Sequence, residues 1–186
     1  MTRLSAQANE GASARWPAYT PENHGAGIVH LGLGNFARAH LLDYTDRVLG
    51  QKGGDWRVIG VSLRGTAVAE SLNPQQGHYT LITRSASTEA RVIGALERVL
   101  AGPDVSCATL QAMTAPTCRI VSLTVTEKGY GISSNGQLDH NHPAIVFDLV
   151  NPQTPMGVIG LIVLALNRRM EKGLPPFTVL SCDNLS

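Results

Sequence analysis

The sequence lacks the long apolar runs and the paired cysteines that would place it among membrane or secreted proteins. Its longest apolar stretch, residues 158–166, is about half a membrane span. Residues 1–21 are too polar to hold the apolar core of a secretion signal. Cys107, Cys118 and Cys182 are an odd number of cysteines at wide spacings, which is typical of reduced thiols. We therefore expect a cytoplasmic protein with no membrane partner.

The sequence also has no large excess of charge of one sign. It contains 15 Lys and Arg residues and 14 Asp and Glu residues, so its net charge is +1. A chain without a basic excess or a basic run lacks the electrostatic attraction that nucleic-acid binding needs. We therefore expect no nucleic-acid partner. What the chain does contain is 43% hydrophobic and 16% charged residues over 186 positions, enough to bury a core without disulfides or metals.

Short apolar runs alternate with helical patterns along the chain. The runs that predict buried strands are residues 27–31, 56–61, 119–125 and 177–180. The patterns that predict helices are residues 35–49, 66–72, 106–113, 143–149 and 155–172. Residues 79–83 and 90–96 alternate between apolar and polar side chains, which predicts an exposed hairpin or edge strands. The alternation indicates an α/β fold with a doubly wound, mostly parallel sheet over residues 27–186, after an N-terminal arm at residues 1–26.

A glycine-rich segment between the first predicted strand and the first predicted helix is the sharpest motif. It fits the GxGxxG/A pattern of dinucleotide-binding turns, and it reads Gly32-Leu33-Gly34-Asn35-Phe36-Ala37. In such a turn Gly32 permits the tight bend, Gly34 lets a pyrophosphate approach the backbone, and the small Ala37 lets the helix pack against the strand. The helix N-terminus supplies free N–H groups to the phosphates. We predict that residues 32–36 bind a dinucleotide; the alternative is a plain strand-to-helix turn.

One expected part of a dinucleotide site is missing. An acidic residue that binds the ribose usually ends the second strand of such a fold, about 20 residues beyond the glycines. Here the chain reads Val61-Ser62-Leu63-Arg64-Gly65 at that point and offers no acid. Arg64 either neutralises the 2′-phosphate of NADP or is a solvated loop residue. The residues by themselves therefore leave the choice between NAD and NADP open.

The segment at residues 28–40 (IVHLGLGNFARAH) resembles the polyol-specific long-chain dehydrogenases, the family of mannitol 2-dehydrogenases and fructuronate reductases (mannonate oxidoreductases). Three later segments resemble this family in order and spacing, namely residues 124–130 (TVTEKGY), 175–178 (PPFT) and 181–184 (SCDN). The resemblance covers about residues 16–186. It implies a Rossmann-type domain that binds NAD, with the chain ending before the mostly helical catalytic domain that follows in the family.

The resemblance also implies a reaction and roles for particular residues. Enzymes of this family transfer a hydride between nicotinamide and C2 of a polyol or hexonate, without a metal and with a lysine of the second domain as the catalytic base. Asn184 matches an asparagine that polarises the substrate oxygen, and an amide N–H suits this task without ionisation. Thr126 and Glu127 follow a predicted strand and are expected to contact the cofactor at the carboxyl edge of the sheet. The small-molecule partner is then a polyol or a sugar acid.

Other hypotheses remain beside this one. The chain is alternatively an isolated nucleotide-binding module, catalytically inactive because the catalytic domain is absent, or an interaction protein with an empty Rossmann fold. A face intended for an absent domain predicts self-association through exposed apolar side chains. Arg38 suits either a cofactor contact or the capping of its helix. His140 and His142 alternate in a turn-forming loop with no evident third ligand, so we expect no metal site.

Overall fold

Five parallel strands form the central sheet of the computed structural model, which describes Leu4, residues 14–133 and residues 135–183. The strand order is β5-β2-β1-β6-β7, and each neighbouring pair is parallel. The strands are β1 (Ala26–Leu31), β2 (Arg57–Val61), β5 (Leu96–Leu100), β6 (Ile120–Leu123) and β7 (Thr178–Ser181). The order reverses at β1, so the predicted doubly wound α/β fold is confirmed and all five strands end at one edge of the sheet.

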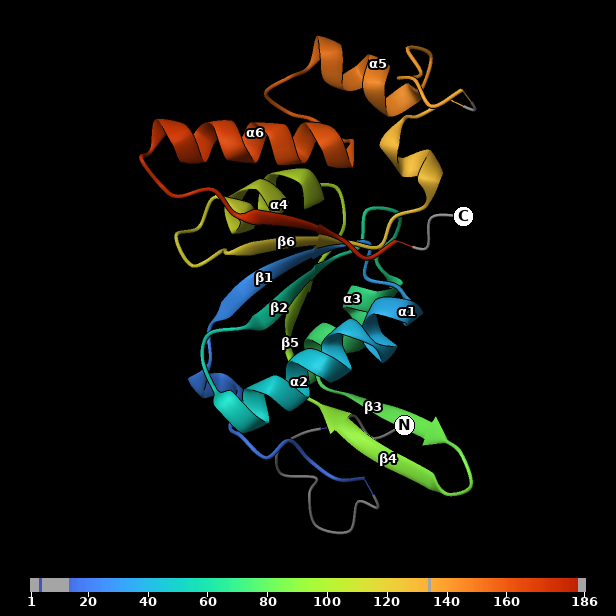
Figure 1. Cartoon of the computed structure of the whole chain (residues 1–186), viewed down its shortest axis with the longest axis vertical. Helices are drawn as coiled ribbons and strands as arrows, with labels where there is room; N and C mark the ends of the chain where they lie inside the picture. The colour runs from blue at the N-terminus through green and yellow to red at the C-terminus, as the bar shows by residue number, and fades with distance from the viewer. Residues whose placement is uncertain (1–3, 5–13, 134, 184–186) are drawn as a thin grey trace.

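Helices cover both faces of this sheet (Figure 1). The helices on one face are α1 (Asn35–Ala39), α2 (Leu41–Lys52) and α3 (Ala67–Leu72). Those on the other face are α4 (Val105–Met113) and α6 (Val158–Glu171), with α5 (Pro143–Val150) lying beyond α6. Alternate side chains of each central strand enter the two cores: in β2, Val58 packs on the α1–α3 side while Ile59 and Val61 pack on the α4–α6 side.

Two predicted elements differ from the structure. The single helix predicted at residues 35–49 is divided into α1 and α2 at His40, whose φ of −119° and ψ of −71° are distorted from helical values. The strand predicted at residues 90–96 is wrong as one element, because β4 ends at Ile93 and a separate strand, β5, begins at Leu96. A register shift opposite Val58 and Ile59 marks Glu97 as a bulge residue, which conceals the alternation of β5 in the sequence.

An antiparallel hairpin lies outside the main sheet, as predicted. It consists of β3 (Tyr79–Arg84) and β4 (Thr88–Ile93). The hairpin is held against α2 by Arg91, whose guanidinium contacts Asp43 at 2.6 Å and Asp46 at 2.9 Å. Backbone hydrogen bonds from Arg15 to Ala90 and from Val92 to Arg15 place the described end of the predicted N-terminal arm beside β4. Arg15 and the hairpin therefore brace the helices that follow the glycine turn.

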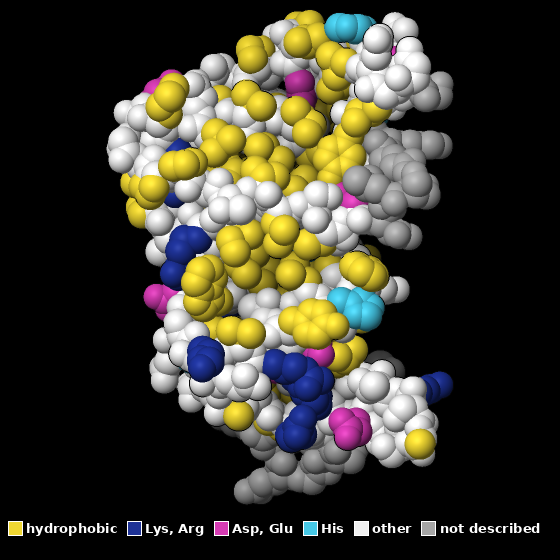
Figure 2. Space-filling model, in the orientation of Figure 1, with side chains coloured by type: hydrophobic (Ala, Val, Ile, Leu, Met, Phe, Trp, Pro, Cys, Tyr) yellow, Lys and Arg dark blue, Asp and Glu magenta, His cyan; other side chains and the backbone are white. Residues whose placement is uncertain are grey.

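A face over α5 and α6 carries exposed apolar side chains, and Figure 2 shows them gathered over these helices. Leu149, Val150, Val163 and Met170 are all more than half exposed. Three of them, Leu149, Val163 and Met170, border a groove of about 680 Å³ between the two helices. A patch of this kind is typical of interaction surfaces. The self-association expected from the sequence stays a prediction.

None of the helices in the described part of the chain has the length and apolar character of a membrane span.

Candidate functional site

A cleft of about 550 Å³ lies at the carboxyl edge of the sheet, beside the point where the strand order reverses. Its walls are the turn after β1, the segments after β2 and β6, and the loops that lead into α5 and α6. The lining residues are Gly32, Leu33, Gly34, Ser62, Leu63, Arg64, Thr124, Val125, Thr126, Gly129, His142, Ala144, Met156, Gly157 and Val158. Ligands of doubly wound α/β proteins bind at this position, so the cleft is the candidate functional site.

Gly32 makes the tight turn that opens the cleft. Its φ is +93°, and a Cβ at this position would lie 2.4 Å from the carbonyl oxygen of Thr124. The amides of Gly32 and Leu33 both donate to the carbonyl of Val61, at 3.0 Å each, which joins the turn to β2. Both the backbone conformation and the close approach of the segment after β6 therefore require glycine here.

Gly34 has a different reason to be glycine. Its extended backbone, with φ −98° and ψ −172°, is open to any residue. Among the described residues, a Cβ would meet only the carbonyl oxygen of Gly32, at 3.8 Å. Because Gly34 lines the cleft, a side chain here would take up room that a ligand can use. The described part of the fold has room for a side chain at this position. A ligand that lies close to the backbone here does not leave room for one.

Leu33 faces the core rather than the cleft. Its side chain is buried, and it sits against Gly60 of β2, where an added Cβ would lie 2.4 Å from Leu33 Cδ2. The backbone of Leu33, and not its side chain, is thus what the turn offers to a ligand. Ala37 is also fully buried, between α1 and the sheet, which agrees with the need for a small residue at the last position of the motif.

Asn35, Phe36 and Arg38 lie at the head of α1, next to the lining residues. The first amides of a helix have no carbonyl of an earlier turn to bond, so those of Asn35 and Phe36 are donors available to an anion. The Phe36 ring is exposed, 4.7 Å from the ring of His40. Arg38 donates to the carbonyl of Leu33 at 3.5 Å and to the side-chain oxygen of Asn35. This guanidinium adds positive charge beside the turn.

Arg64 lies at the rim of the cleft, after β2. Its side chain is exposed, and Ser62 closes the segment by donating to the carbonyl of Gly65 at 2.8 Å. The described residues that line the cleft include no acid. The acid that usually binds the ribose is absent after β2, and no other described element supplies one to the cleft. Arg64 and His142 are the ionisable members of the lining among the described residues.

The segments after β6 and β7 meet at the same edge. The Tyr130 hydroxyl donates to Asp183, which also accepts from Ser181 at 2.9 Å. Burial and this carboxylate raise the pKa of Tyr130, so the phenol stays protonated and the pair remains intact at neutral pH. Thr126, an expected cofactor residue, lines the cleft. The backbone of Glu127 lies in the short helical turn Glu127–Tyr130, and Asn184 lies outside the described residues.

The remaining family-like segment, residues 175–178, lies at the opposite end of β7. The carbonyl of Pro175 accepts from Arg169 at 2.8 Å, and Phe177 is buried in the core. Arg169 is itself fully buried and also donates to the carbonyls of Met113 and Ala115. The segment therefore anchors the start of β7 to α6 and the end of α4, and it has no part in the cleft.

His30 is a residue to which sequence reasoning gave no role. It lies in β1, fully buried, with Nδ1 2.9 Å from the hydroxyl of Ser122 and Nε2 2.8 Å from that of Thr124. Burial lowers the pKa of the ring to about 4, although the Gly32 carbonyl and Asp183 act in the opposite direction. His30 is therefore neutral throughout the physiological range. No pattern within β1 reveals this, because both partners come from the segment around residue 122.

Acid is expected to destabilise the protein through His30. In the unfolded chain the ring takes up a proton near pH 6.5, whereas in the folded protein it does so near pH 4. Stability is therefore full above pH 6.5 and falls as the pH drops towards 4, by about 3 kcal/mol from this residue. Urea denaturation at pH 7 and pH 4 should show this extra loss in the wild type and not in His30→Gln. His140→Gln, at an exposed histidine, is the control and should behave as the wild type does.

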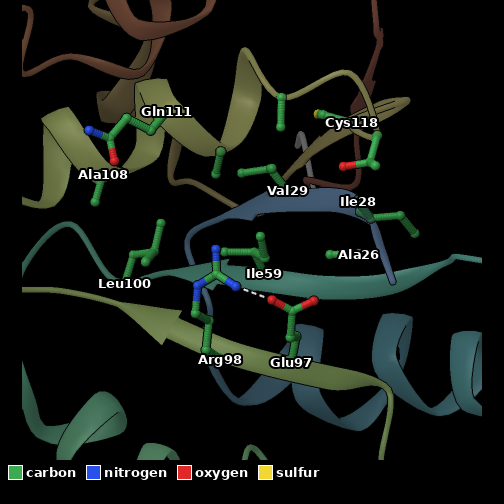
Figure 3. Close-up of a pocket in the computed structure, with 13 residues that line it drawn as sticks. Ala26, Ile28, Val29, Ile59, Glu97, Arg98, Leu100, Ala108, Gln111 and Cys118 are labelled. Carbon is green, nitrogen blue, oxygen red and sulfur yellow. Dashed lines mark hydrogen bonds and ion pairs between the residues drawn. The ribbon is translucent and has the colours of Figure 1, made fainter. Parts of the chain in front are cut away.

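A second cavity, of about 410 Å³, lies between α4 and the face of β1, β2 and β5 (Figure 3). Arg98 and Glu97 of β5 form an ion pair on one side of it, and Ala108 and Gln111 of α4 lie on the other. It is bordered by Ala26, at the amino end of β1, and it contains neither the glycine turn nor a carboxyl end of β1 or β6. This position does not match that of a dinucleotide site.

The described side chains contain no group of three His, Cys, Asp or Glu residues that could hold a metal ion. The candidate site is lined by backbone donors, hydroxyl groups, Arg64 and His142.

Comparison with known proteins places these features in a family. Residues 26–186 match the mannitol dehydrogenase Rossmann domain. The mannitol 2-dehydrogenase of Pyrenophora tritici-repentis is 43% identical over 174 residues, which are 91% of this chain and 31% of that protein. The D-mannonate oxidoreductase of Escherichia coli is 46% identical over 164 residues, 85% of this chain and 34% of that protein. The chain thus spans about a third of the length of these curated relatives.

Solved structures agree in fold. The Pseudomonas fluorescens mannitol 2-dehydrogenase, in its ternary complex with NAD and D-mannitol, superimposes with a TM-score of 0.92 and 39% identity. The match covers 99% of this chain and 39% of that one. A D-sorbitol dehydrogenase in substrate-free form gives a TM-score of 0.92 at 37% identity, over 99% of this chain and 40% of that one. The family resemblance inferred from the four sequence segments is confirmed.

Proposed function

The chain belongs to the mannitol dehydrogenase family through its Rossmann domain, and on this premise we propose that it binds NAD in the cleft at the carboxyl edge of the sheet. The observation that carries the proposal is the pair of glycines. Gly32 is required by the backbone, whereas Gly34 leaves space beside the cleft that the described residues do not fill. A glycine that the protein does not require for its own packing is explained by a ligand that must reach the backbone.

The residues around the turn suit the parts of NAD. The pyrophosphate would be held at the turn by the backbone of residues 33–36, with the guanidinium of Arg38 adding positive charge. The adenosine ribose would lie towards Ser62 and Arg64, after β2, and the nicotinamide towards Thr126, after β6. Glu127 and Asn184 are proposed to act at this end, as the family resemblance implies. NAD would supply the carbon centre that accepts or donates a hydride.

We propose that the protein works as an oxidoreductase on C2 of a polyol or hexonate, with mannitol and mannonate as the two substrate classes. Both classes are represented among the relatives, by mannitol 2-dehydrogenase and by D-mannonate oxidoreductase, so fructuronate reduction is included. The contribution of the described residues is to bind and orient the cofactor and to exclude water from one side of it. Asn184 would polarise the substrate oxygen by donating a hydrogen bond.

A second candidate, a nucleotide-binding module without turnover, is supported by the composition of the cleft. Hydride transfer to or from an alcohol needs a group that exchanges the hydroxyl proton. Among the described residues that line the cleft, Arg64 and His142 are ionisable, and an arginine does not release its proton near neutral pH. His142 is then the one described lining side chain that could take the hydroxyl proton, and the lysine that the family resemblance implies is not among these residues. Binding and turnover are therefore separate questions for this chain, and each needs its own measurement.

The experiment is a calorimetric titration with NADH and with NADPH, followed by an assay of NADH oxidation with fructose and with fructuronate. We expect saturable NADH binding. Turnover of either sugar would support the oxidoreductase, and its preference would identify the substrate class. Binding without turnover would support the nucleotide-binding module. If neither cofactor binds, the proposed function is wrong.

The choice between NAD and NADP is expected to depend on Arg64. Arg64→Glu places a carboxylate where the second strand of NAD-dependent folds usually ends, so it should repel the 2′-phosphate of NADPH and suit the ribose hydroxyls of NADH. We expect NADPH affinity to fall about tenfold, with NADH affinity unchanged or higher. Arg84→Glu, at the exposed end of the hairpin strand β3, makes the same charge change away from the cleft and is the control. Equal losses of both cofactors would contradict the role of Arg64.

A further inference from the structure

A chain of hydrogen bonds runs from the buried centre of the sheet to the glycine turn. His30 and Ser122 are opposite residues of β1 and β6, and both are fully buried. The imidazole Nδ1 lies 2.9 Å from Ser122 Oγ, and Nε2 lies 2.8 Å from Thr124 Oγ1. Thr124 Oγ1 in turn donates to the carbonyl oxygen of Gly32 at 2.8 Å. Four groups thus connect the sheet interior to the residue on which the turn depends.

The direction of every bond in this chain is fixed by chemistry. The Gly32 carbonyl has no proton, so the Thr124 hydroxyl must donate to it. That hydroxyl has only one proton, so it accepts from the ring, and Nε2 of His30 carries the hydrogen. Nδ1 of the neutral ring is then an acceptor, and the Ser122 hydroxyl donates to it. The geometry therefore assigns the Nε2–H tautomer to His30.

The Gly32 carbonyl is the atom that the turn must hold in place. It accepts from the Gly34 amide at 2.7 Å as well as from Thr124, and these two bonds set its direction. The backbone carbonyl of Thr124 lies so close to Gly32 that no Cβ fits between them. A small movement of Thr124 therefore moves Gly32, Gly34 and the donors at the head of α1 together.

We infer that His30 is a positioning residue for the cofactor: by donating to Thr124 it fixes the Gly32 carbonyl and thereby the turn that holds the pyrophosphate. The inference rests on the proposed function for its ligand. His30 does not line the cleft, so it acts through Thr124 and the turn alone. The low pKa of the ring keeps it neutral, and it therefore offers the same donor to Thr124 over the whole physiological range.

The test uses variants that keep or remove one bond each. His30→Gln places a side-chain N–H near the position of Nε2, whereas His30→Asn is too short to reach Thr124. Thr124→Ser keeps the hydroxyl, and Thr124→Val keeps the shape without it. Ser122→Ala removes the hydrogen bond at the other ring nitrogen, Nδ1. Ser122 is buried as deeply as His30, but it does not contact the turn. The measurements are NADH affinity by calorimetry, stability in urea, and the NMR signals of the Gly32 and Gly34 amides.

We expect His30→Asn and Thr124→Val each to weaken NADH binding about tenfold, the effect of about 1.4 kcal/mol from one lost hydrogen bond. The double variant should lose no more than either single one. His30→Gln, Thr124→Ser and Ser122→Ala should stay within about twofold of the wild type in affinity, even where their stability falls. Such a separation of affinity from stability is not expected of a residue that only fills the core.

Where the wild type binds NADH, two results would overturn the inference. One is wild-type NADH affinity in folded His30→Asn and Thr124→Val. The other is a loss in Ser122→Ala as large as in His30→Asn, which would mean that His30 only supports packing. If the wild type itself does not bind NADH, the proposed function fails, and the NMR signals decide separately: Gly34 amide shifts in His30→Asn but not in His30→Gln support the link to the turn, and unchanged shifts in both overturn it.

Discussion

Replacing Gly34 with aspartate is expected to weaken NADH binding roughly a thousandfold, about 4 kcal/mol, while the fold stays intact. The backbone of Gly34 is in an extended conformation open to all residues, and no atom of the described residues lies within 3.8 Å of its Cβ position. The carboxylate would therefore project into the cleft, where the pyrophosphate is proposed to lie. It would take the space of the ligand and repel its charge in a site partly shielded from water.

Calorimetry measures the NADH affinity of the variant, and urea denaturation measures its folding stability. Gly34→Ala adds the methyl group without the charge and should give an intermediate loss. Gly50→Asp is the matched control, because Gly50 lies near the far end of α2. Of the described residues, only Tyr19 and Ala18 lie near its Cβ position, at 3.7 and 3.8 Å. It should bind NADH as the wild type does. If Gly34→Asp keeps NADH affinity, the pyrophosphate does not lie at this turn.

Gly32 and Gly34 illustrate how far the sequence alone can specify the site. The apolar run before them and the helical pattern after them predict the strand, the turn and the helix. The structure confirms the strand and the turn in place, and it divides the helix at His40. The motif assigns the tight bend to Gly32 and the approach of a ligand to Gly34, but it does not show which residue lies against Gly32. Gly32 is glycine because Thr124, far along the chain, comes within contact distance, and only the pairing of β1 with β6 produces that approach.

The same limit applies to residues that the sequence analysis passed over. His30 looks like one polar residue in an apolar strand, and its partners become evident only from the register that sets it opposite Ser122. Tyr130 and Asp183 are brought together by the parallel pairing of β6 and β7. Local patterns predict the elements well because each is set by its own apolar spacing. Side-chain networks between elements depend on register, which those patterns do not contain.

Replacing Arg91 with leucine is expected to cost about 3–5 kcal/mol of folding stability, a large share of the 5–15 kcal/mol that is typical of a domain. The Arg91 side chain is 11% exposed and bonds two carboxylates of α2, those of Asp43 and Asp46. Leucine fills much of the same space but leaves both carboxylates without their shared cation. Asp43 keeps Arg47 at 3.0 Å, whereas Asp46, with a side chain only 3% exposed, has no other cation among the described ion pairs.

Asp46 carries most of this cost because of what surrounds it. Its Oδ1 accepts from the Tyr19 hydroxyl at 2.7 Å and from the Gly94 amide at 2.8 Å, so the carboxylate joins α2 to the hairpin and to the N-terminal segment. Burial and the nearby carboxylate raise the pKa of Tyr19, which keeps this phenol a donor. Both remaining bonds can be made to an amide oxygen. Asp46→Asn in the Arg91→Leu background should therefore recover part of the lost stability, by removing the charge and keeping the acceptor.

Urea denaturation of Arg91→Leu, with Arg98→Leu as the control, separates a buried ion pair from an exposed one. Arg98 pairs with Glu97, but their side chains are 49% and 24% exposed, so its loss should cost no more than about 1 kcal/mol. A small and equal effect in both variants would contradict the bracing role of Arg91. A large effect in Arg91→Leu that Asp46→Asn partly reverses would show that unpaired charge, rather than lost packing, is the cause. The hairpin would then be part of what holds α2, and with it the helix at the glycine turn, in place.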